Sequence, residues 1–302
     1  MDLFYNDDYT ASKYAFDTTR KSKIIYESLI DTPIKNLDII DPSDFLADAE
    51  EQISKVHSSR YINAVKSGKP KELAESQGFE WDKGIYKMAM SHTAGLLAAT
   101  NSVITSGGVA GSLSSGLHHA NIFSGTGFCT FNGLGAAAHY AQQKFDAGRI
   151  LILDFDAHAG GGTWDMISNI LNAASESVVQ VDVTCAPFDI YDAEGQSKLL
   201  YADYSNYRET IIGALDYAKK KLGKFDLIIY NAGMDPLNSG ISMNDIKFRE
   251  KAVRNFIQDT PAIFALAGGY KWGGKTLDEV ASWHRITIDT WAKTYAKQTT
   301  IM

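Results

Sequence analysis

The residues best suited to catalysis or metal binding are three polar side chains at alternate positions of one short stretch. Asp154, Asp156 and His158 end the apolar run Ile150–Leu153, and the glycines Gly160–Gly162 follow. An unbroken apolar run of this length suits a strand buried on both faces. Residues two apart on an extended chain point to the same side, so the carboxylates and the imidazole can converge as half of a metal site. Taken alone, this stretch is equally compatible with a strand end that has a polar turn.

The elements that must position these side chains are strands alternating with helices. This alternation favours a mostly parallel sheet covered on both faces, and we expect an α/β class protein with one three-layer α/β/α domain over residues 1–302. The glycine-rich stretch Ser106–Ser112 is interpreted as a flexible turn. Further strand-like runs are Val178–Val183, Phe225–Tyr230 and Ala262–Leu266, and helical patterns cover Tyr207–Leu222 and Ile246–Asp259.

Other polar residues follow the carboxyl ends of the later strand-like runs. Asp235 comes after the second of them, and Tyr270 comes after the third, preceded by two glycines. In open α/β sheets the site lies beyond the carboxyl ends of the strands. One cleft is therefore expected to hold Asp156, His158 and Asp235, with Tyr270 and the pair His118-His119 nearby.

These residue types together support one reaction class. Two carboxylates and an imidazole bind a divalent ion and leave a position open, which is the pattern of catalytic zinc. Such an ion lowers the pKa of bound water and polarises a carbonyl. A nearby histidine can move the proton, and a tyrosine hydroxyl can donate to the developing oxyanion. The residues predict metal-assisted hydrolysis of an amide.

Five short motifs in order carry a family resemblance over roughly residues 56–271. The motifs are Leu117-His118-His119-Ala120, Gly127-Phe128-Cys129-Thr130-Phe131-Asn132, Asp154-Phe155-Asp156-Ala157-His158, Ala232-Gly233-Met234-Asp235-Pro236 and Ala267-Gly268-Gly269-Tyr270. With these motifs the sequence resembles the histone deacetylase and acetylpolyamine amidohydrolase superfamily, in its bacterial type of deacetylase-like amidohydrolase. The resemblance implies an arginase/deacetylase-like fold and zinc-dependent hydrolysis of an N-acyl amide such as acetyl-lysine or an acetylpolyamine.

The resemblance also implies a role for each matching residue. Zn²⁺ would lie on Asp156, His158 and Asp235. The catalytic residues would be His119 as general base and acid, His118 beside it with Asp154 as its support, and Tyr270 on the substrate carbonyl. The substrate would contact Gly127, Phe128, Phe188 and Gly268, with the two phenylalanines as walls. A monovalent site for K⁺ would use Asp154 and Asp182.

The sequence departs from the family pattern at two positions. A second histidine usually follows the ligand histidine, where this chain has Ala159. An Asp or Asn that supports the second histidine of the pair usually follows, where this chain has Gly161. His118 keeps Asp154, whereas His119 is expected to lack its partner and to be less basic unless another group substitutes.

Two other functions compete with the deacylase. A non-catalytic acyl-group binder would keep the metal pocket, and Gly161 motivates that alternative. A dimanganese ureohydrolase would share the fold, because Asp156-Ala157-His158 resembles its metal motif. However, Gly160 stands where that motif needs an Asp, and no Asp follows within Pro236–Gly240.

Composition limits which binding partners and which cellular compartment are expected. The formal charge of the 302 residues is −7 without a basic run, so no nucleic-acid partner is expected. Two cysteines give no disulfide framework. No apolar run approaches ~18 residues and no signal peptide is recognised, so we expect a cytoplasmic protein that does not enter a membrane. The expected partner is a small-molecule or peptide acyl-amine substrate, and the oligomeric state stays open.

Overall fold

The centre of the sheet consists of the continuous apolar runs. In the computed structural model, which describes residues 1–172 and 177–299, these runs form four adjacent strands in which every residue is buried. All of their pairings are parallel. The expected α/β architecture is therefore confirmed. The strands are β4 (Ile150–Asp154), β5 (Val178–Thr184), β7 (Leu227–Asn231) and β8 (Ala262–Ala265).

Four shorter strands extend this centre into an eight-stranded sheet with the order β2-β1-β3-β8-β7-β4-β5-β6. The stretch interpreted as a flexible turn contains β3, which is buried between β1 and β8. Its Gly111 packs against the ring of Phe264, where any side chain would overlap the ring. The additional strands are β1 (Asp2–Phe4), β2 (Asp38–Ile40), β3 (Val109–Ser112) and β6 (Lys198–Tyr201).

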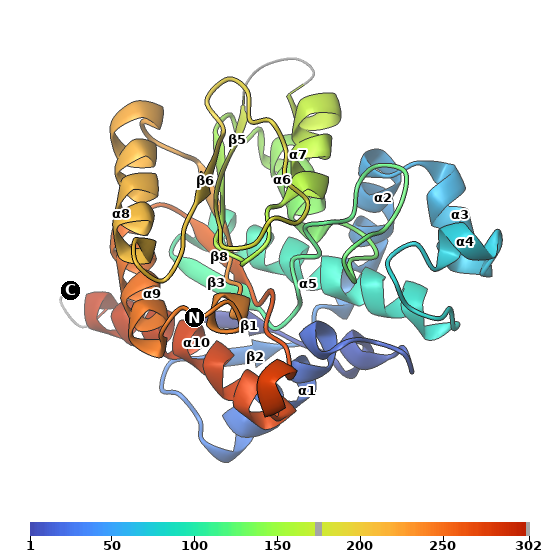
Figure 1. The fold of residues 1–302 in the computed structure, drawn as a ribbon, viewed down its shortest axis with the longest axis horizontal. Helices are drawn as coiled ribbons and strands as arrows, with labels where there is room; N and C mark the ends of the chain where they lie inside the picture. Colours follow the sequence, from blue (N-terminus) through green and yellow to red (C-terminus); the bar gives the residue numbers. More distant parts are fainter. Residues whose placement is uncertain (173–176, 300–302) are drawn as a thin grey trace.

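Side chains alternate between two helical layers. Leu151 and Leu153 point into one core with α1, α8, α9 and α10, whereas Ile150 and Ile152 point into the other core with α2, α5 and α6. Figure 1 shows these two sets of helices on opposite sides of the sheet. The helices are α1 (Asp17–Asp31), α2 (Leu46–Val56), α3 (Ser59–Ser67), α4 (Lys71–Ala74), α5 (Gly84–Ser106), α6 (Gly133–Phe145), α7 (Gly161–Met166), α8 (Tyr207–Tyr217), α9 (Met243–Ile257) and α10 (Leu277–Thr299).

Because the strands are parallel, their carboxyl ends meet at one edge of the sheet. The segments after β4, β5, β7 and β8 all leave from this edge. This geometry brings together side chains far apart in the sequence. In the part of the chain that the structure describes, no helix has the length and apolar character needed to cross a membrane.

Candidate metal centre and active site

Three donor side chains converge beyond β4 and β7. Asp156 and His158 follow β4, and Asp235 opens the short 3₁₀ turn after β7. The Nδ1 atom of His158 lies 3.2 Å from Asp156 Oδ1 and 2.9 Å from Asp235 Oδ2. The two carboxylates are buried, and their oxygens and the imidazole nitrogen form a cluster with metal-ligand spacing. The structure thus brings together the three residues that the sequence singled out.

The bonding of Asp235 shows that this cluster suits a cation. Its Oδ1 accepts a hydrogen bond from the Ala157 amide at 2.9 Å. Its Oδ2 is buried and accepts no hydrogen bond, although His158 Nδ1 lies only 2.9 Å away. A buried carboxylate oxygen without a donor is costly. His158 Nδ1 also pairs with Asp156 Oδ1, and each of the three residues offers a donor atom close enough to the others to share one ion, so the residues fit a divalent metal.

The titration behaviour of the cluster reveals an excess of negative charge. Burial and the neighbouring Asp156 carboxylate together raise the pKa of Asp235 to about 6. Burial alone would lower the pKa of His158, but the adjacent carboxylates of Asp156 and Asp235 outweigh this effect and raise it to about 11. Without a metal ion, a proton held by these three residues partly balances the negative charge of the two carboxylates. A bound cation would balance that charge in its place.

Gly268 packs closely against these carboxylates. A Cβ at this position would overlap the carboxylates of Asp235 and Asp156, and the φ of 33° also favours glycine. The backbone at this residue can therefore approach the two carboxylates because it has no side chain. Gly268 is not among the residues that line the aromatic cavity described below, and its contact with substrate stays a prediction.

The first histidine of the pair has the expected partner. His118 Nδ1 lies 2.7 Å from Asp154 Oδ2, and Asn231 Nδ2 donates to the other Asp154 oxygen at 2.9 Å. Burial would lower the pKa of His118, but Asp154 and Asp156 together raise it to about 10. His118 is consequently a cation at neutral pH. Asp154 therefore lies in contact with His118, where the sequence placed it.

The second histidine has a partner that the sequence did not reveal. His119 Nδ1 lies 2.8 Å from Oδ2 of Asp189, which follows β5. The expectation that Gly161 leaves His119 without a carboxylate was therefore wrong, because another loop supplies one. Burial and the cationic His118 lower the pKa of His119 to about 4, although Asp189 opposes both effects. The pair thus combines one charged and one neutral imidazole at neutral pH.

Buried side chains hold the segment that carries the pair. His57 Nδ1 lies 2.9 Å from the Asn121 carbonyl, and His57 Nε2 accepts the Asn132 amide at 2.9 Å. The Asn132 side chain caps α6 and donates to the carbonyls of His118 and Ala120 at 3.1 Å each. These contacts fix the backbone around both histidines, so their rings cannot drift independently.

An aromatic cavity of about 180 Å³ opens in front of the cluster. Phe128 stacks on Phe16 with ring centroids 4.0 Å apart, and Phe188 meets the His119 ring edge-on at 4.9 Å. The sequence missed Trp272, which stacks on Tyr270 with ring centroids 4.2 Å apart. The lining residues are His119, Gly127, Phe128, His158, Phe188, Tyr270 and Trp272. Gly127, Phe128, Phe188 and Tyr270 are therefore where the sequence placed them.

Asp182 lies beside Asp154 in the β4–β5 register. Its Oδ2 accepts hydrogen bonds from the Gly160 amide at 2.8 Å and from Gln180 Nε2 at 2.9 Å, whereas its buried Oδ1 has no donor. Burial raises the pKa of Asp182 well above its usual value, and Asp154 adds to this shift. A proton or a monovalent cation would satisfy the unpartnered oxygen.

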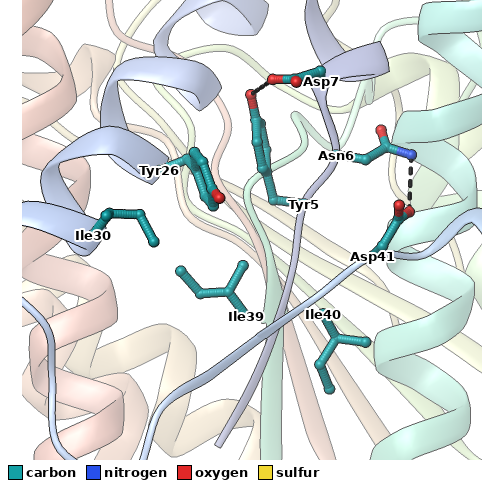
Figure 2. Close-up of a pocket in the computed structure, with 8 residues that line it drawn as sticks. All are labelled: Tyr5, Asn6, Asp7, Tyr26, Ile30, Ile39, Ile40 and Asp41. Carbon is teal, nitrogen blue, oxygen red and sulfur yellow. Dashed lines mark hydrogen bonds between the residues drawn. The ribbon is translucent and has the colours of Figure 1, made fainter.

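A larger cavity at the far edge of the sheet has no such chemistry. It measures about 360 Å³ and lies beside β1 and β2 (Figure 2). Its carboxylates already accept hydrogen bonds, Asp7 from Tyr5 at 3.1 Å and Asp41 from Asn6 at 3.2 Å. Size alone therefore does not make it the functional site, and the smaller aromatic cavity with its donor cluster remains the candidate.

A second group of potential metal ligands overlaps the first. It consists of His118, His119 and Asp156. The Nδ1 atoms of both histidines already face carboxylates, and Asp156 belongs to the first group as well. Gly160 offers no carboxylate here, so the arrangement suits a single ion with two adjacent imidazoles better than two ions.

Comparison with solved structures places the fold. The chain superposes on the crystal structure of acetylpolyamine aminohydrolase from Burkholderia pseudomallei with a TM-score of 0.75. The match covers 96% of this chain and 98% of that chain at 15% sequence identity. The fold is therefore that of the arginase/deacetylase class.

Sequence comparison then gives the family. The family model of the histone deacetylase domain matches residues 15–284, and the chain belongs to this family. Histone deacetylase 2 of Arabidopsis thaliana is 25% identical over 89% of this chain and 74% of its own length. Acetoin utilization protein AcuC of Bacillus subtilis is 34% identical over 43% of this chain and 36% of its own length. Polyamine deacetylase HDAC10 of Homo sapiens is 30% identical over 38% of this chain and 18% of its own length.

Proposed function

We propose that the protein is a zinc-dependent amidohydrolase that removes the acyl group from an acylated amine, such as acetyl-lysine or an acetylpolyamine. The observation that carries this proposal is the convergence of Asp156, His158 and Asp235, with an unpartnered carboxylate oxygen, at the floor of an aromatic cavity. Membership of the histone deacetylase family and the names of the relatives support hydrolysis of acetylated amines.

Asp156, His158 and Asp235 would hold the ion. When bound there, zinc would polarise the amide carbonyl and lower the pKa of a water molecule. The two carboxylates bring enough negative charge to neutralise a dication. Three protein ligands leave a coordination position for the substrate, as catalytic zinc requires.

The two histidines would divide the proton transfers. His119 is neutral at neutral pH and can accept the proton of the attacking water, because its pKa lies at about 4 in the metal-free protein. The same imidazole can then give that proton to the nitrogen of the departing amine. His118 is a cation beside it and would stabilise the negative charge that develops during attack.

Tyr270 and the aromatic walls would orient the substrate. Burial raises the pKa of the Tyr270 hydroxyl well above its usual value, so it remains a neutral donor for the carbonyl oxygen. Phe128 and Phe188 border the cavity and would enclose a linear alkyl chain between the amide and the surface. Their apolar faces also exclude water from the reacting groups.

A potassium ion near Asp154 and Asp182 is part of the same proposal. The unpartnered Asp182 oxygen supports it. A cation there would compensate the negative charge of the neighbouring Asp154 carboxylate. A cytoplasmic location stays a prediction of the sequence.

The alternatives have less support than the hydrolase. The acyl-group binder was motivated by the missing partner of His119, and Asp189 removes that motive. The ureohydrolase needs carboxylates for a second ion, and Gly160 and the turn after Asp235 offer none.

A metal-replete activity screen tests the proposed function. Purified protein loaded with zinc should contain one equivalent of the metal and release acetate from acetyl-lysine peptides or acetylated polyamines. Asp156→Ala should lose metal and activity together, whereas the exposed carboxylate variant Asp216→Ala is the matched control and should keep both. A fully zinc-loaded wild type that hydrolyses no acyl amide across a broad panel would refute the hydrolase and favour the binder.

A further inference from the structure

The partner of His119 comes from a loop that carries no metal ligand. This segment, the β5–β6 loop (residues 185–197), joins the end of β5 to β6 and contains Phe188 and Asp189. The Oδ2 atom of Asp189 is 2.8 Å from His119 Nδ1 and also accepts the Gly162 amide at 3.2 Å. Because Nδ1 faces this carboxylate, Nε2 is the ring nitrogen left for the reaction.

The space for Asp189 exists because position 161 is a glycine. A Cβ on Gly161 would lie 2.5 Å from both the carbonyl oxygen and Oδ1 of Asp189. No ordinary non-bonded contact is that short, so any side chain at 161 would displace the β5–β6 loop. The φ of Gly161 is not positive, so volume and not backbone conformation makes glycine necessary. The absence of a side chain at position 161 therefore leaves the space that Asp189 occupies.

Several hydrogen bonds hold the β5–β6 loop against the segment 157–159, which contains His158. The amides of Cys185 and Ala186 donate to the Ala157 carbonyl at 2.8 and 2.9 Å, and the Ala159 amide donates to the Phe188 carbonyl at 3.2 Å. Farther along, Tyr191 stacks on Trp164 of α7 at 5.2 Å. These contacts bracket Asp189 on both sides, so its carboxylate is held in place and not merely nearby.

The conformation of Asp189 is itself unusual. Its φ of 56° lies in the left-handed region, which non-glycine residues adopt rarely and Asp more readily than most. Its side chain is about one-fifth exposed, whereas the His119 side chain is almost fully buried. A strained backbone at a contact with a buried imidazole is characteristic of functional positions.

We propose that Asp189 is the positioning residue for His119, that it replaces from the β5–β6 loop the carboxylate absent at position 161, and that Gly161 is required to admit it. The proposal rests on the proposed function in one respect, namely that His119 acts as the base. Asp189 would fix the tautomer with the proton on Nδ1 and leave Nε2 free to take a proton. Because Phe188 precedes Asp189, the substrate wall and the support of the base then move as one unit.

The tautomer of His119 is the direct readout and does not require activity. Long-range ¹H–¹⁵N spectra of imidazole-labelled protein, zinc-free and zinc-loaded, should show His119 protonated on Nδ1, with its signals assigned by their loss in His119→Gln. Asp189→Ala should lose this fixed tautomer. Asp189→Asn should keep it, because the Gly162 amide orients the amide oxygen toward His119. Asp192→Asn removes an exposed carboxylate from the same loop and should leave the spectrum unchanged.

Kinetics separate positioning from a general loss of structure. Asp189→Ala should lower kcat by about 10- to 100-fold at full zinc content while KM stays near the wild-type value. Asp189→Asn should recover most of this loss, and Asp192→Asn should show none. Gly161→Ala retains the carboxylate but displaces the loop, so it should resemble Asp189→Ala in both tautomer and kcat.

The outcomes are distinguishable from failure of the proposed function. If wild type hydrolyses no acyl amide but Asp189→Ala still loses the tautomer, the activity is refuted and the positioning role stands. If Asp189→Ala or Gly161→Ala keeps the wild-type tautomer, the positioning role is refuted. An equal fall of kcat in Asp192→Asn would also overturn it, because the effect would then come from loop charge.

Discussion

Removing the hydroxyl of Tyr270 should abolish most of the turnover while leaving the site intact. Phe at this position keeps the ring that stacks on Trp272 at 4.2 Å and lies 5.7 Å from Phe16, so the cavity keeps its shape. Among the described residues the hydroxyl has no protein hydrogen-bond partner, so its donor capacity is available to the substrate. Tyr270→Phe thus deletes one preorganised donor and little else.

The expected size of the effect follows from the burial of this donor. Tyr270 is only 5% exposed, and burial keeps its pKa well above its usual value. Loss of one such donor to a developing oxyanion typically costs about 3–4 kcal/mol, which is a fall in kcat of about 10²- to 10³-fold. Ground-state binding depends mainly on the aromatic walls, so KM should change much less than kcat.

The assay measures acetate release by zinc-loaded protein over a range of substrate concentrations, together with zinc content. Tyr201→Phe removes a hydroxyl from a tyrosine that is 57% exposed and serves as the control, with wild-type kinetics expected. A Tyr270→Phe enzyme with full zinc and kcat within a few-fold of wild type would show that the carbonyl oxygen is stabilised by other groups. The assignment of Tyr270 as the donor would then be wrong.

Two further predictions concern the dependence of stability on pH. Burial lowers the pKa of His57 to about 3, so the unfolded state binds more protons than the folded state below pH 6.5. The free energy of unfolding should therefore fall by about 1.4 kcal/mol per pH unit from pH 6.5 toward pH 3. Denaturant unfolding of His57→Gln should show a weaker dependence on acid pH, and an unchanged dependence would contradict a buried neutral imidazole. Burial lowers the pKa of Lys21 from 10.5 to about 7, so wild-type stability falls as pH decreases from 10.5 to 7. Lys21→Met should therefore gain roughly 2 kcal/mol relative to wild type between pH 9 and pH 7, and the gain should level off below pH 7. A pH-independent difference would show that burial does not lower the pKa of Lys21.

The sequence was sufficient for the elements whose signals are local. Continuous apolar runs marked the buried strands β4, β5, β7 and β8, because a parallel strand covered on both faces needs apolar residues at every position. The polar residues after those runs then had to meet at one edge. The convergence of Asp156, His158 and Asp235 could therefore be predicted from spacing and topology alone.

Strands whose identity depends on their neighbours were missed. β3 contains Gly111 and looked like a turn, but its small residue accommodates the ring of Phe264 on the adjacent strand β8. β2 and β6 are short, lie at the edges of the sheet and are partly exposed, so neither has a sustained apolar pattern. In each case tertiary packing decided the structure and local propensity did not.

Asp189 illustrates why a missing residue in a motif does not establish a missing function. The contact with His119 spans 70 positions of sequence, and no spacing rule relates the two residues. The available signals were Gly161, where a side chain was expected, and the position of Asp189 directly after Phe188, a wall of the same cavity. The site needs a carboxylate beside Nδ1 of a buried imidazole, and it does not matter which position of the sequence supplies that carboxylate. Because two loops border that point, either can supply the oxygen, provided that the other leaves room for it.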